Sequence, residues 1–300
     1  MENLTEKINY LKKEKNAVIL AHYYTPPETQ ALADYVGDSF YLAKKAKESK
    51  CDVIVFCGVK FMGESAKILN PEKTVLMPDL TADCPMAHMA TEEKIKLLKK
   101  EYSDLAVVCY INSTAELKAL SDICVTSSNA VNIVEKLPQK NIFFIPDKNL
   151  GRYVKETVKT KNIILNDGYC PIHEKMNIDE VLKQKELHPD AKILAHPECN
   201  EEICKIADFL GSTLEIIEYS KHDECMEYII LTEIGVKYQL TKNNPEKNFY
   251  FIDSSPICAD MKLNTPENIL NVLQNGENEV ILTTKTNENA LLPLDRMLEI

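Results

Sequence analysis

Three cysteines recur along the chain at nearly equal intervals. Cys84, Cys170 and Cys258 lie 86 and 88 residues apart, and each occupies a polar loop that follows an apolar segment. Three thiolates with no fourth cysteine at a matching spacing fit an iron–sulfur cluster in which one iron has no protein ligand. Such an iron acts as a Lewis acid toward a substrate oxygen and stabilises departing hydroxide. Because electron carriers usually close their clusters with four cysteines, the spacing indicates dehydration chemistry.

A zinc site is the alternative use of these thiols. Structural zinc is usually closed by four ligands, often with close pairs such as C-x-x-C, and the sequence contains no such pair. His173 follows Cys170 by three residues and could complete a Cys₃His set, so zinc remains open on the residues alone. The other seven cysteines lie mostly in apolar runs or on predicted helices, where buried thiols behave as small hydrophobic groups.

Polar pairs at a matching interval supply further reactive groups. They end the apolar segments 17–24, 105–112 and 191–198, and they are His22 with Tyr24, Tyr110 with Asn112, and His196 with Glu198. Residues two apart on a strand share one face, so the two members of a pair point the same way. Dehydration requires removal of a proton, and Glu198 is predicted to be the acid/base residue, with His196 binding a substrate carboxylate. His22 and Tyr24 are predicted to hold substrate oxygens, and His22 to shuttle a proton.

Hydroxyl side chains are the candidates for binding anions. They are Ser39, Ser127, Ser212 and Thr213. Ser127 lies at a predicted strand-to-helix junction, where a hydroxyl and free backbone N–H groups suit a phosphate. The same position would also suit a helix N-cap with no ligand at all. Residues 211–213 are interpreted in the same way, as a site for substrate carboxylates.

The elements that must position these residues follow a repeated pattern. Short apolar runs alternate with longer amphipathic segments, which is typical of an α/β fold with parallel strands. After the three segments above, a second strand of each repeat is predicted at 51–58, 121–128 and 207–213, and a third at 73–79, 141–147 and 227–233. An interval this long and regular predicts three copies of one supersecondary unit.

The fold expected is therefore three homologous α/β/α units with short parallel sheets, arranged with pseudo-threefold symmetry around a central cavity. The predicted boundaries are 1–87, completed by 265–300, then 88–173 and 174–264. Ligands of open parallel sheets bind beyond the carboxyl ends of the strands. If three such ends meet, the loop cysteines and the polar pairs converge in one cavity.

Composition limits the partners of the protein. The 300-residue chain has a formal net charge of −11, which argues against nucleic acid and anionic membranes, since both need a basic face. No apolar run approaches the ~20 residues that cross a bilayer, and the N-terminal segment lacks the features of a signal peptide. Ten cysteines are expected to stay reduced, and the location expected is the cytoplasm.

Long motifs carry a resemblance to a known family. They are AHYYTPPETQALADYVGDS, GVKFMGESAKILNP, YINSTAELKALSD, VTSSNAV, PDKNLG, HPEC and CADMK, and the similarity runs from about residue 16 to residue 300. In these motifs the chain resembles the quinolinate synthases, the second enzyme of bacterial and archaeal de novo NAD synthesis. The resemblance implies three homologous α/β units around a central 4Fe–4S cluster, with Cys84, Cys170 and Cys258 as its ligands.

The resemblance also implies the reaction and its participants. Iminoaspartate condenses with dihydroxyacetone phosphate, losing phosphate and two waters, and closes to the pyridine ring of quinolinate. Tyr110 and Asn112 are implied to orient substrate near the open iron, and Ser127 to bind phosphate. His173 is expected to line the substrate pocket or to hydrogen-bond a cluster sulfide. An aspartate-oxidising enzyme is implied as a functional partner.

Other function classes stay open from the sequence. A different 4Fe–4S hydro-lyase would share the open iron but act on a single hydroxy acid; the triplicated unit and its polar pairs argue against it. An iron–sulfur sensor would usually carry a nucleic-acid-binding or partner module, and none is visible in this acidic chain. A zinc-stabilised binding protein is the third alternative.

Overall fold

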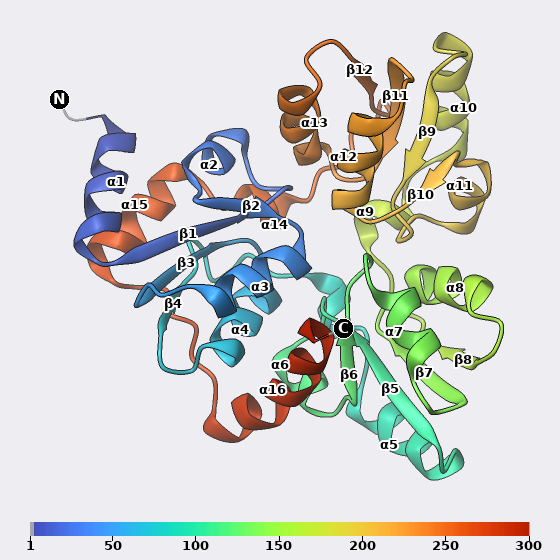
Figure 1. The fold of residues 1–300 in the computed structure, drawn as a ribbon, viewed down its shortest axis with the longest axis horizontal. Coiled ribbons are helices and arrows are strands. Elements are labelled where there is room, and N and C mark those ends of the chain that lie inside the picture. The colour runs from blue at the N-terminus through green and yellow to red at the C-terminus, as the bar shows by residue number, and fades with distance from the viewer. Residues whose placement is uncertain (1–2, 300) are drawn as a thin grey trace.

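Three separate sheets make up the molecule, one in each of three lobes that surround a central region (Figure 1). The structure is a computed structural model and describes residues 3–299. Each sheet has four parallel strands in the same order: the second strand of the unit at one edge, then the first, the third and the fourth. Helices flank each sheet. The predicted fold of three α/β units with short parallel sheets is confirmed.

The first unit contains the sheet β2-β1-β3-β4. Its strands are β1 (Ala17–His22), β2 (Tyr35–Gly37), β3 (Val53–Cys57) and β4 (Thr74–Leu76). Its helices are α1 (Leu4–Glu14), α2 (Pro27–Leu32), α3 (Ser39–Glu48), α4 (Lys60–Leu69) and the 3-10 helix η1 (Pro85–His88). Every residue of β1 is buried, as expected of an apolar parallel strand that is covered on both faces.

The second unit repeats this order as β6-β5-β7-β8. Its strands are β5 (Leu105–Tyr110), β6 (Ile123–Val125), β7 (Asn141–Ile145) and β8 (Asn162–Leu165). Its helices are α5 (Glu92–Glu101), α6 (Ala115–Ala119), α7 (Ala130–Lys136), α8 (Lys148–Thr157) and α9 (Pro171–Glu174). The order of elements therefore matches that of the first unit from the first strand to the short helix that ends each unit.

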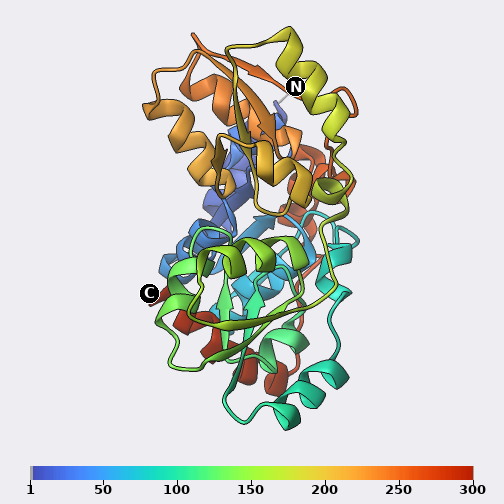
Figure 2. The ribbon, with the colours of Figure 1, turned by 90° about the vertical axis from the view of Figure 1, so that its right-hand side faces the viewer.

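The third unit repeats it again as β10-β9-β11-β12. Its strands are β9 (Lys192–Ala195), β10 (Phe209–Leu210), β11 (Glu227–Leu231) and β12 (Asn248–Tyr250). Its helices are α10 (Ile178–Leu187), α11 (Glu201–Ile206), α12 (Thr213–His222), η2 (Ile234–Val236, a 3-10 helix), α13 (Lys237–Asn243) and α14 (Ala259–Lys262). In Figure 2 this unit lies above the second one.

The C-terminal segment returns to the first two units. Helix α15 (Pro266–Asn275) packs against α1, and α16 (Thr284–Leu298) packs against α6 and β6 of the second unit and α4 of the first. The buried Ala290, Leu294 and Met297 of α16 belong to the core cluster that also contains residues of those two units. Most buried apolar residues of the third unit form two other clusters. The division of the chain into domains at the predicted boundaries stays a prediction.

The structure corrects the predicted assignment of strands within a repeat. Segment 51–58 was expected to be the second strand of its unit, but it forms β3, which pairs with β1 on the opposite side from β2. Segment 73–79 contains the fourth strand, β4, and each unit has four strands rather than three. The missed strands are β2, β8 and β12. They are short, partly exposed edge strands, so they lack the continuous apolar run that marks a buried strand.

Among residues 3–299, none of the helices combines the length and the apolar character that crossing a membrane would require.

Candidate active site

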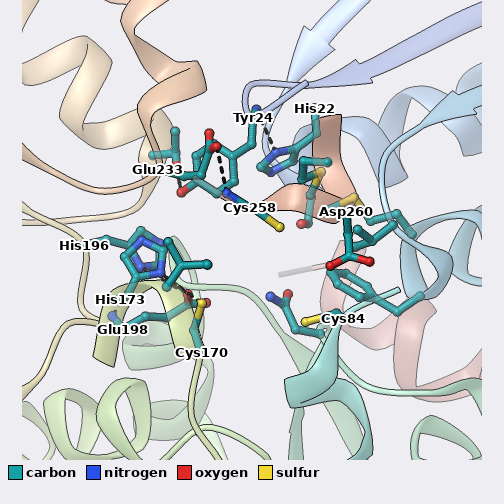
Figure 3. A pocket seen from close by; sticks show the side chains of 18 of the residues that line it. His22, Tyr24, Cys84, Cys170, His173, His196, Glu198, Glu233, Cys258 and Asp260 are labelled. Carbon is teal, nitrogen blue, oxygen red and sulfur yellow. Dashed lines mark hydrogen bonds and ion pairs between the residues drawn. The ribbon is translucent and has the colours of Figure 1, made fainter. Parts of the chain in front are cut away.

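The carboxyl ends of β1, β5 and β9 open on one cavity of about 220 Å³ between the lobes (Figure 3). All the site residues predicted from the sequence except Ser212 line this cavity. They are His22, Tyr24, Ser39, Cys84, Tyr110, Asn112, Ser127, Cys170, His173, His196, Glu198, Thr213 and Cys258. The structure therefore brings together side chains from all three units.

The three cysteines stand at the same place in their units, immediately before the short helix that follows the fourth strand. Cys84 precedes η1, Cys170 precedes α9 and Cys258 precedes α14. Each is partly buried, and the sulfurs point toward the cavity in Figure 3. Because the first backbone amides of a helix have no partner within the helix, this position offers N–H donors to an anionic sulfur.

Burial raises the pKa of all three thiols. The pKa of Cys258 rises to about 11, and those of Cys84 and Cys170 rise further. Amides of the first helical turn oppose this effect, such as that of Ala87 beside Cys84. The free thiols are therefore protonated at neutral pH, and metal binding must release their protons.

The three sulfurs are not arranged to bind one tetrahedral ion together. Within residues 3–299, the three cysteine sulfurs do not all lie within 4.8 Å of one another. Thiolates on one tetrahedral zinc lie about 3.8 Å apart, because Zn–S bonds are about 2.3 Å long. A cluster distributes its cysteine ligands over several irons, so it fits a wider separation. A Cys₃His zinc site would require these sulfurs to move together.

The central strands of the first and third units end in the same turn. The amide of Tyr24 donates to Nδ1 of His22 at 3.2 Å, and the amide of Glu198 donates to Nδ1 of His196 at 3.2 Å. A ring nitrogen that accepts carries no proton, so the proton of each neutral imidazole lies on Nε2. Burial lowers the pKa of His22 to about 3 and that of His196 to about 4. Both rings are therefore neutral Nε2–H donors, and that of His196 lies 3.2 Å from Ser127 Oγ.

Glu198 is the centre of a buried hydrogen-bonded network. The Tyr110 hydroxyl donates to its Oε1 at 2.6 Å, and its Oε2 lies 2.8 Å from Nδ1 of His173. Burial raises the pKa of this carboxyl, but the effects of His196, His173 and Tyr110 together are larger and lower it. Glu198 is therefore ionised at neutral pH, and this is the form that accepts a proton.

Two threonines hold the phenol of Tyr24. Its oxygen lies 2.6 Å from Thr213 Oγ1 and 2.7 Å from Thr232 Oγ1. Burial, followed by the charge of Glu198, raises the pKa of Tyr24 and Tyr110 well above the usual value. Both phenols therefore remain neutral and can donate a hydrogen bond.

The four candidate anion-binding hydroxyls divide into two kinds. Ser39, Ser127 and Thr213 line the cavity. Ser212 is fully buried and its Oγ accepts from the amide of Glu215, so it caps helix α12. The Glu215 side chain in turn accepts from the amide of Ser212, which completes a capping box. Ser212 thus has the structural role that the sequence allowed for such hydroxyls.

The sequence did not single out Glu233, whose carboxylate is 1% exposed at the cavity. Its Oε1 accepts from the amide of Cys258 at 3.1 Å and pairs with Lys262 Nζ at 2.7 Å. Lys262 also donates to the carbonyl of Tyr24 at 2.6 Å. A periodic signal was present, because Glu233 and the buried Asp147 both occupy the N-cap position after the third strand of their units.

Comparison with known proteins decides the family. Residues 6–299 match the family model described as "Quinolinate synthetase A protein". The chain belongs to this family. It is 53% identical over 297 residues to the quinolinate synthase of Fusobacterium nucleatum, with 99% of each chain covered. It is 51% identical to the quinolinate synthase of Clostridioides difficile over 99% of this chain and 97% of the relative. It is 49% identical to the quinolinate synthase of Caldicellulosiruptor saccharolyticus over 100% of this chain and 99% of the relative.

Membership of the quinolinate synthetase A family confirms the resemblance that the motifs carried. These motifs also lie at the cavity. AHYYTPPETQALADYVGDS contains His22 and Tyr24, HPEC contains His196 and Glu198, and CADMK begins with Cys258.

Proposed function

We propose that the protein is a quinolinate synthase that condenses iminoaspartate with dihydroxyacetone phosphate to form quinolinate, phosphate and water. One observation carries the proposal. Side chains at matched positions of three units, the three cysteines among them, line a single cavity around the ionised carboxylate of Glu198. The relatives named as quinolinate synthases cover the same length of chain, which supports the same assignment.

In this proposal Cys84, Cys170 and Cys258 hold one 4Fe–4S cluster. Their shared position before a short helix, at one cavity, supports this assignment. When bound, the cluster supplies an iron without a protein ligand, which acts as a Lewis acid.

The neutral donors of the cavity bind the substrates. Iminoaspartate carries two carboxylates and dihydroxyacetone phosphate carries a phosphate, so both need N–H and O–H donors. His22 and His196 present Nε2–H groups, and Asn112 presents an amide at the cavity. The hydroxyls of Ser39, Ser127 and Thr213 add further donors. These groups bind anions despite the net charge of −11, because binding depends on local donors.

Glu198 takes the proton that dehydration removes. Tyr110 orients this carboxylate, and His173 holds its other oxygen. Tyr24 is a neutral phenol, so it donates to an oxygen atom on which negative charge develops, whereas the single O–H of Tyr110 is donated to Glu198. His22 serves as a hydrogen-bond donor at neutral pH, since its pKa of about 3 keeps the ring uncharged.

The proposal also names a supply for the unstable imine. An enzyme that oxidises aspartate produces iminoaspartate, and it would act in the same compartment. We place that compartment in the cytoplasm, where reduced thiols persist.

The test is quinolinate formation by the anaerobically purified chain with its cluster intact. Iminoaspartate is generated in the assay from oxaloacetate and ammonia, and dihydroxyacetone phosphate is added. We expect quinolinate only when both substrates are present, and we expect its formation to stop after exposure to air. An intact cluster without any quinolinate would exclude this function and leave the other hydro-lyase activities.

A further inference from the structure

One side of the cavity holds a compact set of three different metal ligands. The Sγ of Cys170, a ring nitrogen of His173 and a carboxylate oxygen of Glu198 all lie within 4.8 Å of one another. His173 Nδ1 lies 3.2 Å from Cys170 Sγ and 2.8 Å from Glu198 Oε2. Figure 3 shows the three side chains converging on the side of the cavity away from Cys84.

The other polar atoms of His173 and Glu198, which do not face the point where the three ligand atoms meet, already have hydrogen-bond partners. His173 Nε2 lies 2.9 Å from Thr232 Oγ1, and Glu198 Oε1 accepts from the Tyr110 hydroxyl at 2.6 Å. Histidines that bind a metal through one ring nitrogen almost always donate the other N–H to a fixed partner. In the metal-free chain the Nδ1 proton faces the carboxylate of Glu198, so coordination requires the neutral ring to carry its proton on Nε2 instead. Thr232 Oγ1 can accept that Nε2–H bond, which leaves Nδ1 free to coordinate.

We propose that the cluster-free chain binds one Zn²⁺ between Cys170 Sγ, His173 Nδ1 and the carboxylate of Glu198. Sulfur, imidazole nitrogen and carboxylate oxygen are all ordinary zinc ligands, whereas Mg²⁺ and Ca²⁺ prefer oxygen alone. Binding forms three bonds to the metal and releases the Cys170 thiol proton to solvent. One thiolate and one carboxylate then neutralise the two charges of the ion, so the buried site carries no net charge. A fourth ligand position remains for water.

Zinc at this place excludes the iron–sulfur cluster, because both would use Cys170. The inference does not depend on the proposed reaction, since it concerns the chain before a cluster is present. It differs from the Cys₃His alternative because Cys84 and Cys258 are not ligands.

The experiment uses the full chain, stripped of iron and fully reduced, with Zn²⁺ as the probe and a chromophoric chelator as the competitor. We expect one Zn²⁺ per wild-type chain. Cys170→Ser, His173→Gln and Glu198→Gln should each weaken binding at least ~100-fold, since loss of an outer partner alone costs about 10–100-fold. Thr232→Val removes such an outer partner and should weaken binding by about 10–100-fold.

Matched variants separate this site from its alternatives. Cys84→Ser, Cys258→Ser and His196→Gln should keep wild-type zinc affinity; His196 Nδ1 lies 3.9 Å from Glu198 Oε2 and accepts a backbone amide instead. Circular dichroism identifies any variant that fails to fold, and Thr232→Val then serves in its place. Absence of zinc binding by the wild-type chain would overturn the proposal. Equal losses in the variants of Cys84, Cys170 and Cys258 would also overturn it.

Discussion

The first and third units end their central strands in the same turn but place different side chains in it. His22 and His196 occupy equivalent positions, accept an amide from the residue two further on, and share a lowered pKa. The residue that donates this amide differs, being Tyr24 in one unit and Glu198 in the other. The former supplies a neutral phenol and the latter a charged carboxylate.

The second unit extends this comparison. Tyr110 takes the position of the two histidines, and Asn112 takes the position of Tyr24 and Glu198. The repeated backbone therefore fixes where a side chain enters the cavity, and the residue type at each entry point sets its chemistry. Two kinds of substitution therefore test the comparison. The first removes a residue that occurs in all three units, and the second removes a residue that occurs in one unit alone.

The largest effect should come from removing a shared feature. Cys84→Ser, Cys170→Ser or Cys258→Ser should each abolish the cluster and all quinolinate formation, because each removes one of only three ligands. Iron content and turnover of the anaerobic protein measure this. Cys124→Ala is the control, since Cys124 is buried in the core away from the cavity and should leave iron bound. Unequal loss of iron among the three cysteine variants would show that the three units do not contribute equally to the site.

The next effect should come from the residues that differ. Glu198→Gln should keep the cluster but lower kcat by about 10²–10⁴-fold, the usual contribution of a general acid or base. Tyr24→Phe should lower it only about fivefold, since it removes a neutral hydrogen-bond donor worth about 1 kcal/mol. Single-turnover rates with matched iron content measure both. Equal losses in the two variants would mean that the carboxylate has no special role.

The shared histidines predict a dependence of stability on pH. Their folded pKa values of about 3 and 4 lie below about 6.5, so the unfolded chain binds protons first as the pH falls. The free energy of unfolding should therefore fall by about 2 kcal/mol per histidine between pH 7 and pH 5. Urea denaturation of the cluster-free chain measures this fall.

Two variants sharpen the pH measurement. His22→Gln should remove one histidine's share of the decline, whatever it does to stability at pH 7. The exposed His222 is the control, and His222→Gln should leave the decline unchanged. A decline that His22→Gln leaves intact would show that this ring is not buried in its neutral form.

The smallest effect separates two hydroxyls that the sequence treated alike. Ser212→Ala should lower the free energy of unfolding by about 1 kcal/mol, the usual value of an N-cap, and leave KM unchanged. Ser127 caps no helix and contacts His196, so Ser127→Ala should raise KM with little change in stability. Chemical denaturation and steady-state kinetics together distinguish them. A raised KM for Ser212→Ala would contradict the division.

The features that could be predicted from the sequence are those that recur in all three units and contain a continuous apolar run. The apolar runs of the buried strands β1, β5 and β9 mark where each strand ends, so the polar pairs at those ends could be located from the sequence interval alone. The edge strand β2 has three residues and mixed exposure, which leaves no pattern to detect. For this reason segment 51–58 was assigned to the wrong place within its unit.

The roles of several site residues could not be predicted from the sequence because they depend on side-chain contacts that form only in the folded chain. Nothing in the spacing of Ser212 separates a helix cap from an anion ligand, because both use the same hydroxyl. Glu233 and Lys262 are 29 residues apart and pair only after the fold brings them together. The ionised state of Glu198 likewise depends on Tyr110 and His173, which lie in other parts of the chain.

Helix α16 has a consequence for the order of events during folding. In sequence it follows every other described helix, yet its apolar residues are part of the core that the first two units share. The first two units therefore cannot complete this shared core until α16 has docked on α4, α6 and β6.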